Sequence, residues 1–276
     1  MIKGYYKEII INNKKNEIYY ETAGEGVPLI CLHTAGGDSR QFKYLLRNKE
    51  LTSKFQIIAF DLPFHGRSFP PDKWWEKQYF LSTDLYIEII EKFVQSIEVE
   101  SPLIMGCSMG GSITLELAYR YPKKYRGVIA LEAAEKTSGR FNDYLFHPRI
   151  NGGEMCASNI FELTSPYSPE KNRRESWWIY SQGAPGIYYG DLYFYSEEWD
   201  ATDRVQYIDT QMCPVHLLTG EYDYSCTPEM TKQTAKKIKG AYYKRMEKIG
   251  HFPMIENPEL FLEYLRPVLK KYQKDN

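Results

Sequence analysis

The sequence predicts an α/β fold built on a mostly parallel sheet, and two observations lead to this prediction. Short, nearly continuous apolar segments recur along the chain, which is typical of strands covered on both faces. Segments of helical periodicity, such as residues 82–97 and 110–121, separate these apolar segments. Because strand and helix alternate, we expect a twisted sheet of about eight strands with helices on both of its faces.

The expected strands are short and rich in apolar residues. The first two form a hairpin, because β-branched and aromatic residues flank the polar sequence NNKKN. The strands are expected at residues 5–11, 17–22, 28–33, 55–62, 102–107, 125–133, 214–220 and 241–247. The helices are expected at residues 82–97, 110–121, about 228–238, and 257–272. Ser82 supplies an N-cap signal for the first of these helices.

The alternation stops after residue 134 and returns with the strand at 214–220. Residues 136–200 contain many loop-forming residues, no strong strand signal and a dense set of aromatic side chains. We therefore expect a lid over residues 136–200, inserted into a core that consists of residues 1–135 and 201–276.

Composition and charge favour a small molecule as the partner. Lys and Arg number 35 against 36 for Asp and Glu, so no basic field would attract nucleic acid or an anionic membrane. The five cysteines lack metal-ligand spacing, so we expect reduced thiols and no metal. No apolar run approaches the roughly 18 residues of a membrane span, and the amino terminus lacks a signal-peptide core. We expect a cytoplasmic protein.

A G-x-S-x-G pattern, with Ser108 at its centre, lies where a predicted buried strand meets a predicted helix. A tight turn at this junction strains the backbone of the serine, and the flanking Gly106 and Gly110 relieve the crowding. The position predicts a nucleophilic hydroxyl held out of the sheet. The alternative is a serine that only caps the helix.

A serine hydroxyl needs a base to take its proton, and the base needs a group that orients it. Of the five histidines, His251 is our candidate base, because it lies in a turn between a predicted strand and the final helix. Asp223 follows the strand at 214–220 and is the candidate acid. Glu221, or Glu132 and Glu135 after the preceding strand, remain alternatives.

These motifs resemble those of the α/β-hydrolase family, and the resemblance covers residues 17–134 and 208–276. GCSMGG is similar to the nucleophile elbow of that family, GEYD to its acid loop, GHFPMIENPE to its histidine loop, and DLPFHGRS to its loop after the fourth strand. The four motifs occur in the family's order, which makes the match far more specific than any one of them. The resemblance implies a mainly helical cap inserted after the sixth strand.

The resemblance also implies an oxyanion hole made of backbone N–H groups. One N–H comes from the residue after the nucleophile, Met109, and one from the loop HTAGGD, where Ala35 holds the matching position. Thr34 stands where many relatives have glycine, and it is a second candidate for that donor.

The lid aromatics predict an apolar roof for a substrate pocket, since a lid must present some face to the substrate. We take Trp177, Trp178 and Thr34 as candidate substrate-binding residues. Exposed lid aromatics would also suit a homodimer. One lid arginine could hold a substrate carboxylate, and the sequence does not distinguish among Arg140, Arg149, Arg173 and Arg174.

The expected function is that of a serine hydrolase acting on a small, partly apolar or aromatic carboxylic ester or lactone, without a metal or an organic cofactor. Relatives that open epoxides or remove halide carry Asp at the elbow, so Ser108 argues against those reactions. The alternatives are an amidase and a carbon–carbon bond hydrolase of a vinylogous diketone of the meta-cleavage-product type. That branch usually has a proline that HTAGGDSRQF lacks. A noncatalytic ligand-binding receptor on the same fold is the alternative from a different class.

Overall fold

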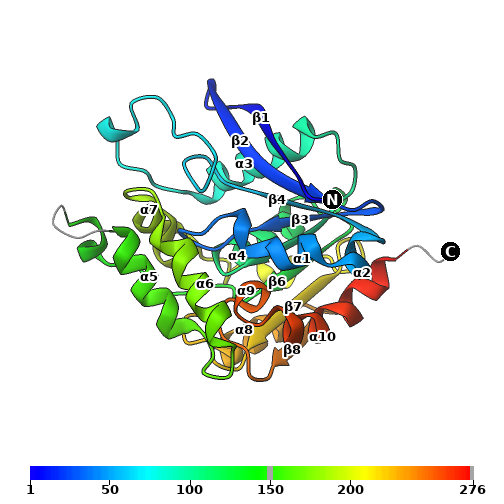
Figure 1. The fold of residues 1–276 in the computed structure, drawn as a ribbon. Coiled ribbons are helices and arrows are strands. Elements are labelled where there is room, and N and C mark those ends of the chain that lie inside the picture. Colours follow the sequence, from blue (N-terminus) through cyan, green and yellow to red (C-terminus); the bar gives the residue numbers. More distant parts are fainter. Residues whose placement is uncertain (148–151, 274–276) are drawn as a thin grey trace.

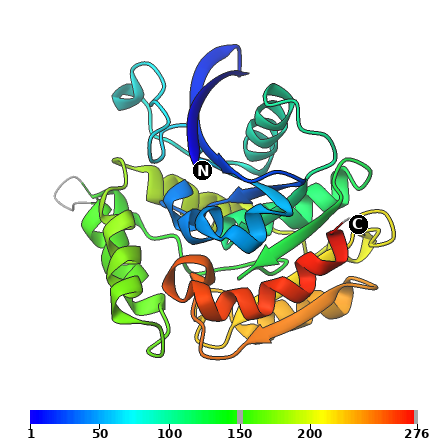
Figure 2. The ribbon, with the colours of Figure 1, turned by 45° about the vertical axis from the view of Figure 1, so that its right-hand side comes forward.

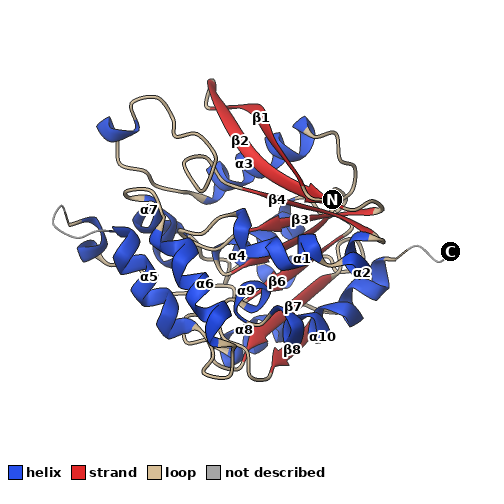
Figure 3. Cartoon of the chain, viewed as in Figure 1, coloured by secondary structure: helices blue, strands red, loops and turns tan. Residues whose placement is uncertain are grey.

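The computed structural model describes residues 1–147 and 152–273, which form one eight-stranded sheet flanked by helices (Figures 1 and 3). The strands are β1 (Lys3–Ile11), β2 (Lys14–Ala23), β3 (Val27–Leu32), β4 (Phe55–Phe60), β5 (Leu103–Cys107), β6 (Gly127–Leu131), β7 (Val215–Gly220) and β8 (Tyr242–Met246). The helices are α1 (Lys43–Arg47), α2 (Lys49–Thr52), α3 (Thr83–Ser96), α4 (Met109–Arg120), α5 (Gly152–Leu163), α6 (Glu170–Ser181), α7 (Ile187–Tyr193), α8 (Pro228–Lys237), α9 (Pro253–Glu256) and α10 (Pro258–Leu269).

The order of the strands across the sheet is β1-β2-β4-β3-β5-β6-β7-β8. β1 pairs antiparallel with β2, and β2 pairs antiparallel with β4. All pairs from β4 to β8 are parallel. The predicted fold class, a mostly parallel α/β sheet, is confirmed.

The hairpin turn between β1 and β2 is tighter than the sequence analysis predicted. β1 ends at Ile11 and β2 begins at Lys14, so only Asn12 and Asn13 form the turn. Both asparagines have positive φ angles, 48° and 59°. This backbone matches the right-handed twist of a two-residue hairpin, and asparagine tolerates it better than most residues.

The sheet is covered on both faces because successive strand residues point to opposite sides. Along β3, Leu29 and Cys31 pack with buried side chains of α1, α2, α9 and α10. Ile30 and Leu32 pack instead with side chains of α3 and α4. Figure 2 shows α10 in front of the strands, with α3 in the upper right of the view. The continuous apolar strand sequences thus reflect burial on two faces.

The chain between β6 and β7 is helical, as expected for an insertion after the sixth strand, and it carries α5, α6 and α7. α5 and α6 contact one another and lie side by side at one side of the molecule (Figures 1 and 2). Lys136 and Asp200 form an isolated antiparallel bridge and an ion pair of 2.7 Å where the insertion starts and ends. The division into a core and a separate cap of residues 136–200 stays a prediction.

The last part of the insertion is packed into the main core. α7 continues into a π-helical turn, Phe194–Glu198. Leu192, Phe194 and Trp199 belong to the same buried cluster as the side chains of α3 and α4. The Trp199 indole donates to the Ala134 carbonyl at 3.2 Å. Among the described helices, none combines the length and the hydropathy needed to cross a bilayer.

Candidate active site

The turn between β5 and α4 holds Ser108 in a strained backbone conformation, with φ 57° and ψ −117°. The Ser108 N–H donates to the Leu131 carbonyl at 2.8 Å, which ties the turn to β6. A Cβ added at Gly106 would collide with the Gly110 backbone, and one at Gly110 would lie 2.6 Å from the Leu32 carbonyl oxygen. Both glycines are therefore needed for the close approach of β5, α4 and β3.

An aspartate–histidine pair lies at the same carboxyl edge of the sheet as Ser108. Asp223 follows β7 and His251 follows β8, and both side chains are buried. The His251 Nδ1 lies 2.7 Å from the Asp223 Oδ2. The other carboxylate oxygen, Oδ1, accepts the N–H groups of Ser225 and Cys226 at 2.7 and 3.0 Å. Asp223 is thus fixed by backbone donors and orients the imidazole through Nδ1.

The Nε2 atom of His251 makes no hydrogen bond to any other described residue. With Nδ1–H donating to Asp223, the lone pair of Nε2 remains available as a base. Ser108 and His251 line the same small cavity, and no hydrogen bond joins them. Such catalytic contacts often tighten only when substrate binds.

A second carboxylic acid, Glu132, lies beside the Asp223–His251 pair. Its polar atoms lie within 4.8 Å of those of Asp223 and His251, and its carboxyl oxygens accept the Gly220 N–H at 2.9 and 3.0 Å. Burial and the neighbouring Asp223 carboxylate raise the pKa of Glu132 well above its usual value, which favours its protonated form. The sequence analysis kept Glu132 as an alternative to Asp223 for the role of orienting acid. In the structure, Asp223 holds the imidazole and Glu132 adjoins Asp223.

Two carboxyl groups and an imidazole are a donor set that could ligate a metal ion. In this chain, however, the facing atoms are already paired. His251 Nδ1 is bonded to Asp223, and Asp223 and Glu132 accept backbone N–H groups. The arrangement fits the orientation of a base better than an open metal site.

The cavity beside Ser108 and His251 has a volume of about 20 Å³, room for about one water molecule. Side chains of the inserted segment form its roof. The lining residues are Thr34, Ala35, Ser108, Arg140, Ile160, Leu163, Tyr188, Leu192, Tyr195, Ser225, His251 and Phe252. A substrate must therefore displace roof side chains to reach Ser108.

Several backbone N–H groups in the loop after β3 already donate hydrogen bonds. The Thr34 N–H donates to Gln41 Oε1 at 3.1 Å, and the Gly36 N–H donates to Asp191 Oδ2 at 2.7 Å. Among the described residues, the N–H groups of Ala35 and Met109 have no hydrogen-bond acceptor. Thr34 is thus unsuited to donate its N–H to an oxyanion, whereas Ala35 and Met109 are free to do so.

A second aspartate–histidine pair lies nearby, between the insertion and the core. Asp191 of α7 accepts His65 Nε2 at 2.8 Å and the Tyr79 hydroxyl at 2.9 Å, in addition to the Gly36 N–H. His65 Nδ1 faces the Pro63 carbonyl at 3.0 Å. Because both ring nitrogens face acceptors, His65 donates from both, which requires the charged imidazolium.

The pKa values of the two neighbouring histidines move in opposite directions. Burial alone would lower the pKa of His65, but the Asp191 carboxylate raises it above its ordinary value. Burial and the charge on His65 lower the pKa of His33 to about 4. Neutral His33 accepts the Leu62 N–H at Nε2, 3.1 Å away. Sequence reasoning did not identify Asp191, because its partners lie more than a hundred positions away in the chain.

The two tryptophans that we expected to bind substrate lie on the surface of the protein, and their role in binding stays a prediction. Trp177 and Trp178 are 42% and 59% exposed and do not line the cavity. They lie on the outer face of α6, whose inner face buries Ile179 and Tyr180. Aromatic density alone did not reveal this face, whereas helical spacing over residues 170–181 would have done so.

Tyr195 is a cavity residue that sequence reasoning missed as a site residue. It lies in the π-helical turn, lines the cavity, and has a buried hydroxyl without a hydrogen-bond partner among the described residues. Burial raises the pKa of Tyr195 well above its usual value, and the adjacent Thr137 and Ser108 side chains act in the opposite direction. π-helical turns often occur at functional sites.

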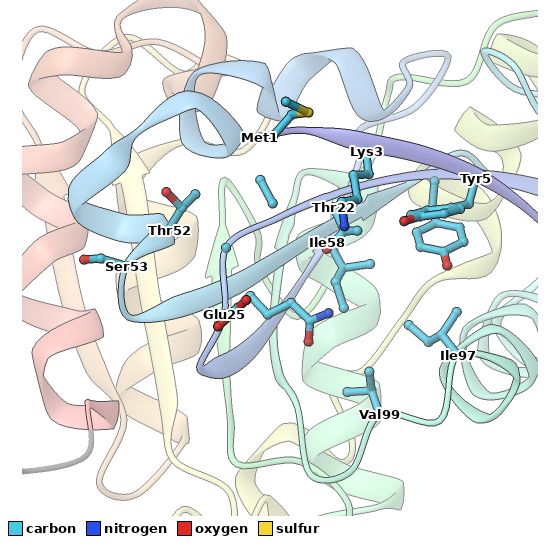
Figure 4. A pocket seen from close by; sticks show the side chains of 14 residues that line it. Met1, Lys3, Tyr5, Thr22, Glu25, Thr52, Ser53, Ile58, Ile97 and Val99 are labelled. Atoms are coloured by element: carbon cyan, nitrogen blue, oxygen red, sulfur yellow. The ribbon is translucent and has the colours of Figure 1, made fainter.

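A much larger groove, of about 720 Å³, lies at the opposite edge of the sheet (Figure 4). Residues that precede the parallel strands border it, including Ser53 before β4 and Val99 before β5. Its described lining residues include Lys3 and Glu25 but no histidine, so it lacks the combination of a strained serine and an aspartate-bound histidine found at the carboxyl edge. The small cavity at the carboxyl edge is therefore the candidate active site.

Comparisons with known proteins agree with this fold. A sequence profile of the alpha/beta hydrolase fold family matches residues 27–151. Pyrrolizixenacetamide deacetylase of Xenorhabdus hominickii is 24% identical, over 92% of this chain and 94% of its own length. A thermophilic esterase from Thermogutta terrifontis superposes with a TM-score of 0.83 at 19% identity, over 99% of this chain and all of its own.

The enol-lactonase of Burkholderia xenovorans LB400 also shares the fold, with a TM-score of 0.79 at 17% identity over 95% of this chain and 99% of its own. The profile match covers β3 to β6 and includes the turn that carries Ser108. Together with the sheet order and the four motifs, these matches confirm the predicted resemblance. The chain has the α/β-hydrolase fold.

Proposed function

We propose that this protein is a serine hydrolase in which Ser108 is the nucleophile, His251 the general base and Asp223 the orienting acid. The observation that carries the proposal is that a strained serine and an aspartate-bound imidazole line one cavity. A serine that only capped α4 would need neither this backbone conformation nor an oriented base beside it. The same argument disfavours a noncatalytic receptor.

The proposed reaction begins when His251 Nε2 takes the Ser108 proton and Oγ attacks the substrate carbonyl carbon. The N–H groups of Ala35 and Met109 then donate to the oxyanion, aided by the positive amino end of α4. Imidazolium, stabilised by Asp223, protonates the leaving group, and an acyl-enzyme remains. Water attacks the acyl carbon with His251 again as base, and Ser108 is released.

The substrate we favour is a small, partly apolar or aromatic ester or lactone. Leu192, Ile160 and Phe252 give the cavity an apolar wall, which suits a partly apolar or aromatic substrate. The structurally similar proteins named as an esterase and an enol-lactonase support this class. The relative named as a deacetylase of an acetamide keeps an amide as the second candidate. Hydrolysis of a carbon–carbon bond ranks third.

Cytoplasmic localisation and a homodimer also stay predictions. All five cysteines are buried and unpaired, which fits a reducing compartment. The exposed indoles of Trp177 and Trp178 are a surface on which a second copy could pack.

Labelling with a fluorophosphonate tests the proposal, because this reagent reacts with a serine only when a neighbouring base activates it. We expect one adduct, on Ser108, and none in Ser108→Ala, together with loss of hydrolysis of p-nitrophenyl esters in that variant. A folded wild-type protein that takes no adduct would contradict a serine hydrolase. Turnover of a ring-fission diketone without turnover of any ester would reverse the order of substrates.

A further inference from the structure

Arg140 brings a positive charge to the candidate active site. The residue lies in the segment between β6 and α5, where its N–H donates to the Ser196 Oγ at 2.8 Å. Its side chain lines the cavity together with Ser108 and His251. The guanidinium also interacts with the hydroxyl of Tyr188, a buried tyrosine of α7 that lines the same cavity.

This guanidinium differs from the other cap arginines in what it contacts. Arg174 forms an ion pair with Glu170 on the surface at 2.6 Å. Arg173 donates to the Thr164 hydroxyl at 2.9 Å and stacks on the Phe161 ring at 4.5 Å. Among the described residues, no carboxylate forms an ion pair with Arg140, and Arg149 lies outside the described residues.

A partly buried guanidinium without a counter-ion has unused donors in a planar fork, which matches the two oxygens of a carboxylate. The group beside it that attacks the substrate is Ser108. A ligand that bound the Arg140 guanidinium and placed its carbonyl carbon at Ser108 would carry a carboxylate a few bonds from that carbon. Neutral esters would leave the guanidinium unpaired.

We propose that Arg140 binds a carboxylate of the substrate, so that the preferred substrate is a short monoester, lactone or amide that also carries a free carboxylate. The inference rests on the proposed function, because it assumes that Ser108 attacks the carbonyl group. It narrows the substrate class from small esters in general to anionic ones. Arg140 and Ser108 line the same cavity, which favours a short spacer between the carboxylate and the carbonyl carbon.

Paired substrates test this inference. Mono-p-nitrophenyl glutarate carries the carboxylate on the acyl group, and p-nitrophenyl butyrate is its neutral counterpart. 4-Acetoxybenzoate carries it on the leaving group, and phenyl acetate is the counterpart. We expect the wild-type kcat/KM to favour the anionic member of at least one pair by about 10- to 100-fold, the range of a hydrogen bond to a charged group. The favoured pair identifies the side that faces Arg140.

Arg140→Gln should remove most of this preference, and Arg140→Lys should restore part of it, because lysine keeps the charge but lacks the planar fork. Arg173→Gln is the matched control, a cap arginine outside the cavity, and should keep the preference. Free glutarate should inhibit hydrolysis of the neutral ester competitively in the wild type, and more weakly in Arg140→Gln. This inhibition tests the wild-type protein even where a variant fails to fold.

Equal kcat/KM values within both pairs in the wild type, or a preference that survives in Arg140→Gln, would overturn the inference. Fluorophosphonate labelling of Ser108 separates the two proposals. Labelled protein that hydrolyses neutral and anionic esters equally keeps the proposed function and rejects the carboxylate site. Protein that takes no label and hydrolyses no ester rejects both.

Discussion

Two buried aspartate–histidine pairs lie at the carboxyl edge of this sheet, and they differ in what the second ring nitrogen meets. His251 is 2.7 Å from Asp223, and His65 is 2.8 Å from Asp191, so distance alone does not distinguish them. In His65 the other nitrogen also faces an acceptor, the Pro63 carbonyl. In His251 it has no partner among the described residues, and its side chain lines the cavity with Ser108.

This difference distinguishes a histidine that can act as a base from a histidine with a structural role. A histidine that donates from both nitrogens is charged and has no lone pair to accept a proton, so the His65 pair can only join α7 to the core. A histidine with one nitrogen on a carboxylate and a free lone pair can accept the serine proton. His65 and His251 are both buried and both paired with an aspartate. These two properties indicate a well-ordered side chain and do not by themselves indicate catalysis.

The largest expected effect is that of removing the imidazole from the Asp223 pair. His251→Gln should lower kcat by about 10⁴-fold or more, because no other group can take the Ser108 proton. The variant should still fold, because Asp223 keeps the backbone N–H groups of Ser225 and Cys226 as donors. Steady-state ester hydrolysis and thermal unfolding of the same preparation check both statements. A variant that kept a tenth of the wild-type activity would show that His251 is not the base.

The corresponding change in the His65–Asp191 pair should lower the stability of the folded protein. Asp191→Asn removes the counter-ion of the His65 imidazolium, and breaking a buried pair typically costs about 3–5 kcal/mol. The pKa of folded His65 is raised, so the pair contributes fully below about pH 6.5, and this stability is lost as the pH rises through that raised pKa.

Denaturant unfolding of wild type and Asp191→Asn between pH 5.5 and pH 9 measures this dependence. The difference in the free energy of unfolding should be greatest at the acid end and shrink toward the alkaline end. A difference that grew with pH would mean that His65 is neutral in the folded protein. The folded fraction of Asp191→Asn should still be labelled at Ser108, unlike His251→Gln.

Glu132 sharpens the comparison, because its carboxyl group adjoins both members of the Asp223–His251 pair. Glu132→Ala should lower the free energy of unfolding by about 1–3 kcal/mol, since the buried Gly220 N–H loses its acceptor. It should also lower kcat/KM, because the carboxyl group that adjoins Asp223 is lost. Glu132→Gln should stay near wild type, because a neutral amide can still accept from Gly220 and donate toward Asp223. Loss of activity in Glu132→Gln equal to that in Glu132→Ala would mean that Glu132 acts as a charged group.

The smallest expected effect is that of Trp178→Ala. This indole is 59% exposed and belongs to neither pair. Surface substitutions of this kind usually change stability by about 0.5 kcal/mol or less, and kcat/KM should stay within about twofold of wild type. A tenfold rise in KM would restore the interpretation that Trp178 contacts substrate.

The sequence predicted those structural features whose signal lies within a short segment of the chain. The strand and helix periodicities, the glycines around Ser108, and the histidine loop lie within short segments, and the fold follows them closely. The Ser82 cap is also local, and its hydroxyl accepts the Leu85 N–H at 3.3 Å. Because each motif follows the end of a strand, parallel topology alone suffices to bring Ser108, Asp223 and His251 to one edge.

The rest depends on tertiary packing. Asp191 meets His65 and Gly36 across separations of 126 and 155 residues, and nothing near Asp191 in the sequence indicates those partners. The choice among the lid arginines depends on which side chain the roof turns inward, and of the described ones, Arg140, Arg173 and Arg174, Arg140 lines the cavity. Composition reports how many aromatic residues a segment holds and not which face of a helix they occupy, so it did not predict that Trp178 is exposed.

The rate of fluorophosphonate labelling, read by tandem mass spectrometry of the modified peptide, tests the central claim most directly. The account predicts a single adduct on Ser108 in the wild type and a rate at least about 100-fold lower in His251→Gln, since the reagent needs the same base as the substrate. An adduct on another residue, or equal labelling rates in the two proteins, would contradict the assignment of Ser108 and His251 as nucleophile and base.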